Sequence, residues 1–573
     1  MFTGHPKGLY TLALANTGER FGYYTMLAIF TLFLQAKFGY TASETSTIFA
    51  SFLALVYFMP LLGGIIADKW LGYGKTATIG IIVMFAGYLL LAVPTGREDV
   101  LAKIFMFSSL FLISTGTGLF KGNLQVMVGN LYEDSKLQGM RDTAFSIFYM
   151  AINIGALFAP TAATKVTNFF LAKHGLVYNS SIPSLSHQLL DLDASGNNSI
   201  TADGLSKLEA FMHANSSCGI TEVGAFAENY IDKLSTAYNY GFAIACLSLI
   251  ISMIIYVVGK KTYKHADYNA KQLAESNAKN GIKAPAELTK KQTKERVVAL
   301  MLVFAVVLFF WMAFHQNGLT MTFFARDYTE HVATGINRMS FDVFNLVIIV
   351  IAVYSLISML QSKKNKSKII SGAIFAAAAI GLYFKYTYFT EGSVKILPQI
   401  FQQFNPFFVV ALTPISLAIF GALAKKGKEP SAPRKIGMGM VIAACGFIVL
   451  AIGSYGLPTP NEVMDMGGLN SSQLVSSNWL ISTYLILTFA ELLLSPMGIS
   501  FVSKVAPPKL KGAMMGGWFA ATALGNYLVA IIGHLWGDLP LWQVWSVLIV
   551  CCLLSAVFIF SVIKRLDRIT KDA

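Results

Sequence analysis

The sequence predicts an all-α membrane protein with about fourteen transmembrane helices, and three observations support this prediction. Apolar residues make up 55% of the 573 residues, charged residues only 13%, and the mean hydropathy is +0.58. Apolar runs long enough to cross a bilayer recur along almost the whole chain. The net charge of +14 comes mainly from short loops between these runs, which is the positive-inside pattern. A nucleic-acid partner is therefore not expected.

Six predicted spans occupy the first part of the chain, at residues 9–35, 46–67, 76–95, 101–131, 143–170 and 237–258. The loop at 171–236, between the fifth and sixth of these spans, is long and polar and contains more acids than bases. We expect this loop outside the cell. A second long loop, 260–296, is strongly basic, and we expect it on the cytoplasmic side against anionic headgroups.

Eight further spans are expected at 297–325, 341–361, 369–389, 400–424, 436–456, 478–502, 512–537 and 541–563. Basic residues recur in alternate connections, for example Lys69 with Lys75, the turn at 363–368, and the tail at Lys564. The connection between Asn461 and Asn478 contains no Lys or Arg. This alternation predicts a multi-pass protein of the cell (inner) membrane, in contact with lipid, with both termini cytoplasmic.

The first span carries two adjacent charges, Glu19 and Arg20, followed by Tyr23 and Tyr24. Each charge at this depth costs on the order of 2.5–3.5 kcal/mol, so such residues usually face a bundle interior or a wet cavity. One interpretation is that the pair lines a solute pathway. The alternative is a buried ion pair that only fixes helix packing.

The connection between the second and third spans reads Gly63-Gly64-Ile-Ile-Ala-Asp68-Lys69-Trp-Leu-Gly72. Its glycines permit close helix approach, and Asp68 beside Lys69 is a candidate conformational latch. The arrangement resembles the loop signature of the major facilitator superfamily.

Further segments resemble the proton-dependent oligopeptide transporter family. The run from Asn16 to Tyr24 is similar to that family's first-helix motif, and Gly116–Lys121 is similar to its fourth helix. The runs from Phe145 to Pro160, from Glu491 to Gly498 and from Lys511 to Tyr527 resemble its fifth, tenth and eleventh helices, in the family's order.

This resemblance implies a major facilitator fold, in which two six-helix bundles rock about a central cavity to give alternating access. The bundles would span residues 1–258 and 297–573, joined by the basic linker 259–296, with an additional transmembrane hairpin at 341–389 packed outside the core. The implied function is proton-driven import of di- and tripeptides, with the proton as coupling ion and no other cofactor.

The resemblance also implies a binding site for a zwitterionic peptide. Arg20 and Lys121 would bind the carboxylate, and Glu491 with Asn153 and Asn405 would hold the amino end, which suits the donors and acceptors of these side chains. Tyr23, Tyr24, Tyr57 and Trp518 would pack against peptide side chains, and Ser495 completes the predicted set. Asn405 precedes Pro406, where a distorted helix could free backbone groups. Alternatively, the asparagines bridge helices and Trp518 belongs to an interfacial belt.

Three departures from the family pattern affect the predicted proton coupling. Asn16 stands where the motif begins with Glu, and Leu27 stands where a basic residue usually follows the tyrosine pair. His315 stands where the seventh core helix typically has Glu. An ordinary His titrates near about 6.5, so we expect coupling to depend on Glu491, Glu19 and His315. The alternative for His315 is a neutral hydrogen-bonding core residue.

The predicted outer loop includes a weak calcium candidate formed by Asp193, Ser195, Asn197 and Ser199, whose spacing resembles an EF-hand loop without its closing acid. A polar turn that caps a helix from Thr201 explains the same residues and is the preferred interpretation.

Other functional classes have weaker support in the sequence. The spans contain no HExxH, no Gly-x-Ser-x-Gly and no carboxylate dyad, and the five cysteines form no CxxC, so an enzyme is not expected. A transporter of the same fold for another small anionic or zwitterionic solute, with altered or absent proton coupling, stays open. A non-transporting sensor is a third alternative.

Overall fold

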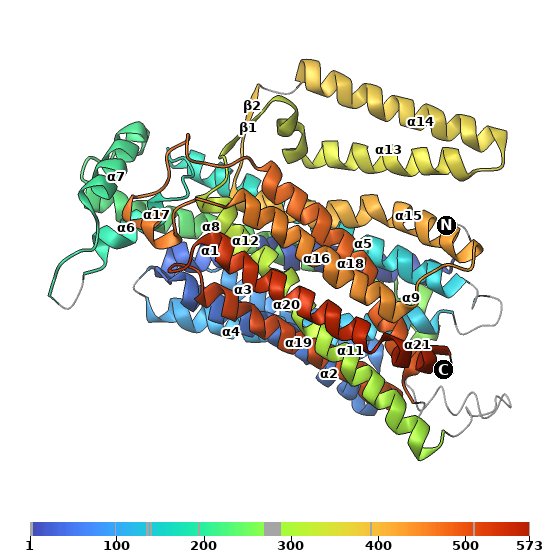
Figure 1. The fold of residues 1–573 in the computed structure, drawn as a ribbon. Coiled ribbons are helices and arrows are strands. Elements are labelled where there is room, and N and C mark those ends of the chain that lie inside the picture. The colour runs from blue at the N-terminus through green and yellow to red at the C-terminus, as the bar shows by residue number, and fades with distance from the viewer. Residues whose placement is uncertain are drawn as a thin grey trace.

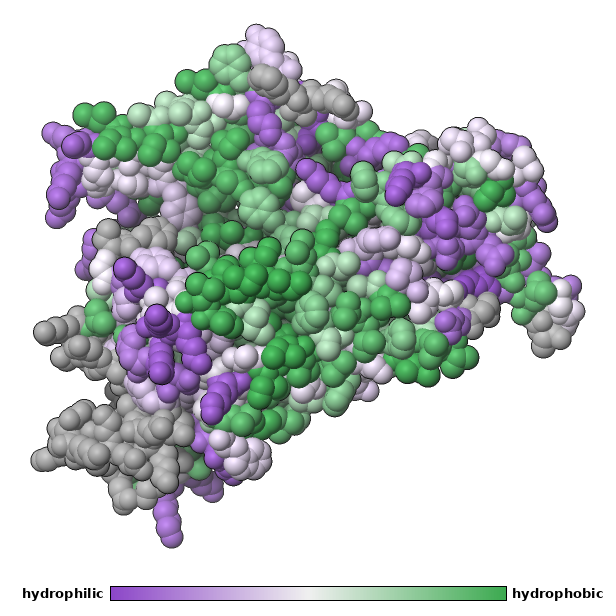
Figure 2. Space-filling model, turned by 180° about the vertical axis from the view of Figure 1, so that it is seen from behind, coloured by the Kyte–Doolittle hydropathy of each residue, from purple (hydrophilic) through white to green (hydrophobic). Residues whose placement is uncertain are grey.

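Helices running roughly side by side make up the described part of the chain (Figure 1). The structure, a computed structural model, describes all residues except 1–3, 98, 133–136, 138–139, 193–194, 269–287, 390–391, 508–509 and 572–573. A hydrophobic band crosses the middle of the molecule between two more hydrophilic ends (Figure 2). This arrangement confirms the predicted all-α membrane architecture.

The N-terminal half contains six long helices within the described residues. These are α1 (Lys7–Phe38), α2 (Ala42–Ile66), α3 (Tyr73–Ala92), α4 (Val100–Asn130), α5 (Arg141–Lys173) and α8 (Val223–Val258). Helix α1 packs between α5 and α8, and α4 packs between α2 and α3. Local sequence signals mark the helix ends. Thr41 and Glu44 form a capping box at the start of α2, and Gly39 ends α1 with a left-handed φ of 65°.

The C-terminal half is built from α11 (Lys290–Phe314), α12 (Thr320–Asp327), α15 (Phe404–Lys425), α16 (Ala432–Gly453), α18 (Asn478–Val505), α19 (Lys511–His534) and α20 (Leu541–Ser561). Helix α16 packs against α18 and α20. The predicted span 297–325 is interrupted by a 3-10 turn, η5 (His315–Gly318), so α11 and α12 are separate segments. The two halves meet where α2 packs against α19 and where α5 packs against α15.

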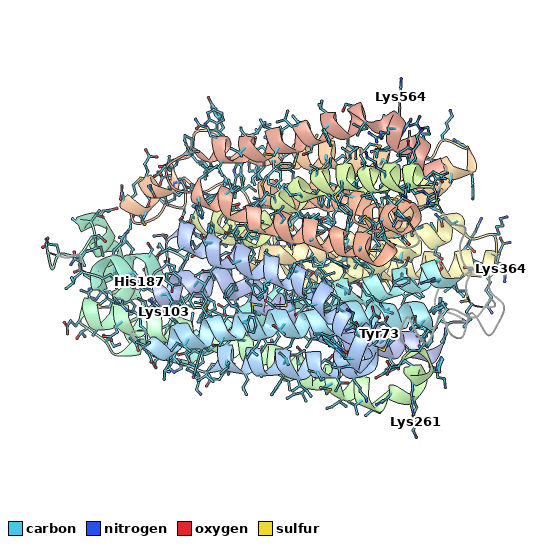
Figure 3. The ribbon with its side chains drawn as sticks, turned by 90° about the horizontal axis from the view of Figure 1, so that it is seen from below. Tyr73, Lys103, His187, Lys261, Lys364 and Lys564 are labelled. Carbon is cyan, nitrogen blue, oxygen red and sulfur yellow. The ribbon has the colours of Figure 1, made fainter. Side chains whose placement is uncertain are left out.

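Thirteen helical segments in the described residues are long and apolar enough to cross a membrane. Helix α1 is not among them, because Asn16, Glu19 and Arg20 reduce its hydropathy, yet its 32 residues lie in the bundle. Both termini lie at the same end of the bundle, here called the terminal end (Figure 1). Lys261, Lys364 and Lys564 lie at this end, whereas His187 lies at the opposite end, here called the distal end (Figure 3).

The predicted extra hairpin is formed by α13 (Val343–Gln361) and α14 (Asn365–Phe384), which continues into a π-helical turn, η7 (Lys385–Phe389). It lies beside α15, with α14 on the outside (Figure 1). At the base of the hairpin, an ion pair and a two-stranded ribbon join its two ends. Asp342 pairs with Lys385 at 2.6 Å, and a short antiparallel ribbon joins β1 (Val332–Thr334) to β2 (Ser393–Lys395) with Ala333 opposite Val394.

The polar segment predicted at 171–236 is shorter than expected, because α8 begins at Val223 and not near residue 237. Residues 174–222 form a helical excursion at the distal end, with α6 (Ile182–Leu190), α7 (Ala202–Ala214) and the 3-10 turn η3 (Ser216–Cys218). The Thr201 side chain accepts a hydrogen bond from the Gly204 amide at 3.1 Å. Thr201 therefore caps α7, as the preferred interpretation of this sequence predicted.

The described part of the basic linker is folded against the N-terminal half. It begins with α9 (Lys260–Tyr263) and the turn η4 (Lys264–Ala266), after which Asp267 accepts a hydrogen bond from the Gly74 amide at 2.7 Å. Asp267 therefore caps the start of α3. The rest of the predicted linker, residues 269–287, lies outside the described residues. The C-terminal helix α21 (Ile563–Lys571) lies at the same end.

Glycines allow α2 and α4 to touch through their backbones. A Cβ atom built on Gly63 would lie 2.2 Å from the carbonyl oxygen of Gly118, whereas one on Gly64 would meet nothing within 4 Å. The close approach therefore depends on Gly63 and not on its neighbour.

We expect Gly63→Ala to lower the apparent melting temperature in detergent, by an amount that corresponds to about 1–3 kcal/mol of overpacking. Gly64→Ala is the matched control, and it should leave this temperature unchanged or raise it slightly because alanine favours the helix. Equal melting temperatures for the two variants would contradict the close approach of α2 and α4.

Candidate functional site

The two charges of α1 form a buried bidentate ion pair. Arg20 donates from Nε to Glu19 Oε2 and from Nη2 to Glu19 Oε1, both at 2.5 Å. The Arg20 side chain is 3% exposed and the Glu19 side chain is fully buried. The guanidinium also lies 4.6 Å from the centre of the Tyr23 ring. Much of the charge of Arg20 is therefore neutralised within its own helix.

Lys121 of α4 has a different environment. Its ammonium lies 4.6 Å from the centre of the Tyr57 ring, a cation–π contact between α4 and α2. Among the residues that the structure describes, Lys121 has no carboxylate within 4 Å and no hydrogen-bond partner. Its side chain is partly exposed. Lys121 is therefore the cation of the site that is available to an added anion.

Glu491 supplies a carboxylate from the other half of the molecule. It lies near the middle of α18 and is 8% exposed. Asn405 of α15 donates to Glu491 Oε2 at 2.9 Å, and the Tyr149 hydroxyl of α5 donates to Oε1 at 3.3 Å. Asn405 also donates to Thr488, one turn before Glu491, at 3.1 Å. The partners of Glu491 are neutral, so its site accommodates a cation.

Aromatic side chains connect these charges across the two halves. Tyr24 and Tyr57 each interact electrostatically with both Arg20 and Glu491. The rings of Tyr23 and Tyr24 pack edge to face with centroids 5.3 Å apart. The structure thus brings Arg20, Lys121 and Glu491 into one region between the halves, and their roles there stay predictions.

The other predicted binding residues lie in less polar surroundings. Asn153 donates to the Tyr149 carbonyl of its own helix at 3.0 Å. Trp518 is 3% exposed and packs against Phe304, so an interfacial-belt position is excluded. A Cβ on Gly498 would lie 1.8 Å from the Trp518 ring, which shows how closely α18 and α19 approach. Ser495 is partly exposed, one turn beyond Glu491.

His315 lies at the break between α11 and α12. Its ring stacks on Trp311 at 5.2 Å and contacts Tyr57 at 5.7 Å, and it interacts electrostatically with Lys121. Nδ1 has no well-formed hydrogen bond to any described residue. The break therefore places an imidazole next to the cation of α4.

Three further predictions have a different outcome or no structural counterpart. The helix distortion expected at Asn405-Pro406 is a change of helix type, because the 3-10 helix η8 (Pro398–Gln403) runs directly into α15, and Pro406 lies in the first turn of α15, where proline is tolerated. Asp68 accepts a hydrogen bond from Tyr73 at 2.5 Å, and among the described residues neither it nor Lys69 forms an ion pair, so the latch stays a prediction.

The third is the calcium candidate, because Asp193 lies outside the described residues and only Ser195, Asn197 and Ser199 of that set are described. Among the described residues, no group of three or more His, Cys, Asp or Glu side chains could hold a metal ion. Calcium binding therefore stays a prediction.

Sequence reasoning assigned no role to Tyr149, Thr488 or Asn526. Thr488 is three residues before Glu491, a helical spacing that could have identified it. Tyr149 and Asn526 belong to the motifs noted above. The hydrogen bond of Tyr149 to Glu491 joins different helices, whereas the buried amide of Asn526 has no hydrogen bond to any described residue. Only the packing of those helices identifies the partners.

A sequence model described as "POT family" matches residues 74–173 and 387–541. The chain is 27% identical to the peptide transporter YePEPT of Yersinia enterocolitica, and the alignment covers 100% of this chain and 97% of that protein. The chain is therefore similar to POT-family transporters along most of its length. The proteins that it matches are transporters and not enzymes.

Other transporters are similar to this chain in sequence or structure along most of its length. Dipeptide and tripeptide permease A of Escherichia coli is 25% identical, with 91% of this chain and 83% of that protein covered. A solved peptide transporter in complex with alafosfalin superposes with a TM-score of 0.64 at 21% identity, covering 99% of this chain and 96% of the other. A solved POT family transporter in complex with 5-aminolevulinic acid gives 0.66 at 18% identity, covering 99% and 98%. These structures confirm the major facilitator-type fold.

We expect Glu19→Gln to lower the apparent melting temperature strongly, because it leaves a buried guanidinium without its carboxylate, at a cost of roughly 3–5 kcal/mol. The double variant Glu19→Gln with Arg20→Gln should recover much of this loss. Asp232→Asn, which removes an exposed carboxylate paired with its neighbour Lys233, is the control and should have little effect. If the Glu19→Gln variant and the unaltered protein have the same melting temperature, the ion pair with Glu19 does not stabilise the buried guanidinium of Arg20.

Proposed function

We propose that this protein is a proton-coupled symporter that imports di- and tripeptides by alternating access. The observation that carries the proposal is the separation of opposite charges between the two halves. Arg20 and Lys121 belong to helices of the N-terminal half, and Glu491 belongs to the C-terminal half. A short peptide carries an ammonium and a carboxylate at its two ends, so it complements this arrangement and joins the halves when it binds.

In this proposal Lys121 is the principal partner of the peptide carboxylate, because Arg20 is already bound by Glu19. The peptide ammonium binds Glu491, whose carboxylate is held in place by Asn405 and Tyr149. Tyr24, Tyr57 and the neighbouring aromatic residues pack against variable side chains without selecting among them. Asn153, Ser495 and Trp518 complete the wall of the site.

Proton coupling is proposed to depend mainly on Glu491. Protonation of this carboxylate removes its attraction for a cation and so weakens the hold of the C-terminal half on the peptide ammonium. Glu19 is a secondary candidate, because its charge is engaged by Arg20. His315 is the other secondary candidate, since it lies next to Tyr57 and interacts with Lys121. Asn16 cannot titrate and has no part in this route.

The closure of one end supports alternating access. Hydrogen bonds between the halves include Thr31 to the Gly318 carbonyl at 3.3 Å and Thr161 to Gln403 at 3.1 Å, and Arg326 also donates to Gln35. These contacts lie toward the distal end. With the basic terminal end in the cytoplasm of a cell (inner) membrane, they describe a molecule that is closed on its outer side.

A second candidate is a transporter of another small zwitterionic or anionic solute with altered coupling. Asn16 and Leu27 favour it, because they remove two charges that the family pattern places in the first helix. Asn16 is 2% exposed, and its amide nitrogen has no hydrogen-bond partner among the described residues. Competition between the test solute and dialanine in an uptake assay separates the two candidates.

We expect Glu491→Gln in proteoliposomes to lose uptake driven by an imposed proton gradient while it keeps some counterflow of labelled dialanine, because only the titrating group is removed. His315→Asn should reduce the gradient-driven rate less. If both variants keep full gradient-driven uptake, the proposed coupling is wrong. If the unaltered protein shows no counterflow of dialanine, the peptide assignment is wrong.

We expect Lys121→Gln to weaken dialanine binding by about tenfold or more, because a charge-assisted hydrogen bond to the peptide carboxylate is lost. Lys103→Gln is a matched control on the same helix, because Lys103 lies at the distal end (Figure 3) near the ring of Tyr40. Calorimetry or a ligand-dependent melting shift measures both. Equal affinities for the two variants would contradict the proposed role of Lys121.

A further inference from the structure

The helical excursion of the N-terminal half holds a short helix of the C-terminal half at the distal end. The excursion contains α6 and α7, and its partner is α17 (Pro460–Asp465) with the turn at 466–468 that follows it. Figure 1 shows α6, α7 and α17 together beyond the ends of the long helices. The segments are about 260 residues apart in sequence, as the Thr201 to Asp465 contact illustrates. No residue in 174–386 is matched by the POT family model, so the excursion lies outside its matched segments.

Lys207 of α7 makes the central contact of this interface. Its ammonium donates to the Met466 carbonyl, to the Gly468 carbonyl at 3.1 Å, and lies 3.2 Å from the Asp203 carboxylate. An ammonium has three N–H donors, so these three oxygens use all of them. Two of the three belong to the other half of the molecule. Thr201 adds a hydrogen bond to the Asp465 carbonyl at 3.2 Å.

The turn after α17 fits between α6 and α7 because it is made of glycine. Gly467 and Gly468 have φ angles of 66° and 97°, which favour glycine. A Cβ on Gly467 would lie 3.2 Å from the Gly204 Cα, and one on Gly468 would lie 3.2 Å from the Ser181 Cβ. The backbone of the turn thus touches both helices and presents its carbonyl groups to Lys207.

Each side of the interface is fixed to its own half. On the N-terminal side, Asp191 after α6 pairs with Arg97 at 2.6 Å, and His187 of α6 hydrogen-bonds to the Ala36 carbonyl of α1 at 2.9 Å. On the C-terminal side, Asn461 of α17 donates to Asp538 at 2.8 Å, and Tyr328 donates to the Pro458 carbonyl at 3.0 Å. Separation of the halves at the distal end must therefore break the contacts between α7 and α17.

We propose that α6 and α7 form a clasp that holds the distal end closed, and that Lys207 is the residue that positions the two halves in this closed state. The proposal rests on alternating access, as proposed above. It adds a step to the cycle: each opening of the distal end releases the carbonyls of Met466 and Gly468 from Lys207. The clasp therefore sets the balance between the two access states without contacting the peptide.

The test measures this balance directly with spin labels at the distal ends of α2 and α18. Ser43→Cys and Asn478→Cys, in a background with Cys218, Cys445 and Cys551 replaced by Ser, place labels on exposed residues, one in each half. In this labelled background, Lys207→Met removes the three donors and keeps the length of the side chain. We expect it to increase the ratio of the long-distance to the short-distance population by about tenfold, because hydrogen bonds to a charged group are lost.

Lys233→Met is the matched control. Lys233 also lies on the distal side of the N-terminal half, but among the described residues it pairs only with the adjacent Asp232, at 3.2 Å. It should leave the distance distribution unchanged. If the Lys207→Met and Lys233→Met variants both give the same distance distribution between the labels as the parent protein, the proposal that α6 and α7 form a clasp is wrong. This readout needs no substrate, so it stands even if dialanine is not transported.

A disulfide gives the opposite perturbation. Ser181→Cys with Gly468→Cys, in the same background, joins two positions whose Cβ atoms lie close to disulfide spacing. The disulfide is formed first, and thioether-linked labels, which a reductant does not release, are then attached at the other two cysteines. The oxidised protein should keep the labels at the short distance and stop uptake of any transported solute, and reduction should restore both. If the cross-linked protein still reaches the long distance, or transports at its reduced rate, opening does not require release of the clasp.

Discussion

Ionised side chains within apolar helices impose the constraint on which the arrangement of this molecule depends. A charge removed from water needs a partner, and the two halves meet this need differently. The N-terminal half pairs Glu19 with Arg20 inside one helix and leaves Lys121 against the ring of Tyr57. The C-terminal half holds Glu491 with the neutral groups of Asn405 and Tyr149. One half is therefore left with a positive group and the other with a negative group, and the proposed zwitterionic substrate would bind both.

The hydrogen bond between Tyr149 and Glu491 joins the two halves at the proposed site. Tyr149 belongs to α5, which also packs against α15, the helix that carries Asn405. Any change in the charge of Glu491 therefore alters its interaction with Tyr149 at an interface between the halves, in addition to its interaction with a bound solute. This physical link connects binding, proton uptake and movement in the proposed cycle.

The chain carries two additions to its long-helix bundles, and both lie where the halves meet. The hairpin is tied to the C-terminal half at its base, yet Phe344 of α13 packs against Phe158 of α5 with ring centroids 6.4 Å apart. The α6–α7 excursion is tied to the N-terminal half and holds α17 of the other half. In the proposed cycle, segments that contact both halves resist their relative movement and so change the energy difference between the two access states without contact with the solute.

The membrane class, the number and order of the long helices, and the resemblance to a transporter family could all be predicted from the sequence. Hydrophobic length and the placement of Lys and Arg are properties of single segments, so they can be read without a fold. The sequence also identified Arg20, Lys121 and Glu491, because ionised groups stand out in apolar segments. It could not find the partners of these groups. That Glu19 binds Arg20, that Tyr149 and Asn405 bind Glu491, and that Lys207 holds the turn after α17 depend on contacts between atoms, most of them on different helices. Only the tertiary structure decided these pairs, because helix packing brings together residues that no local pattern connects.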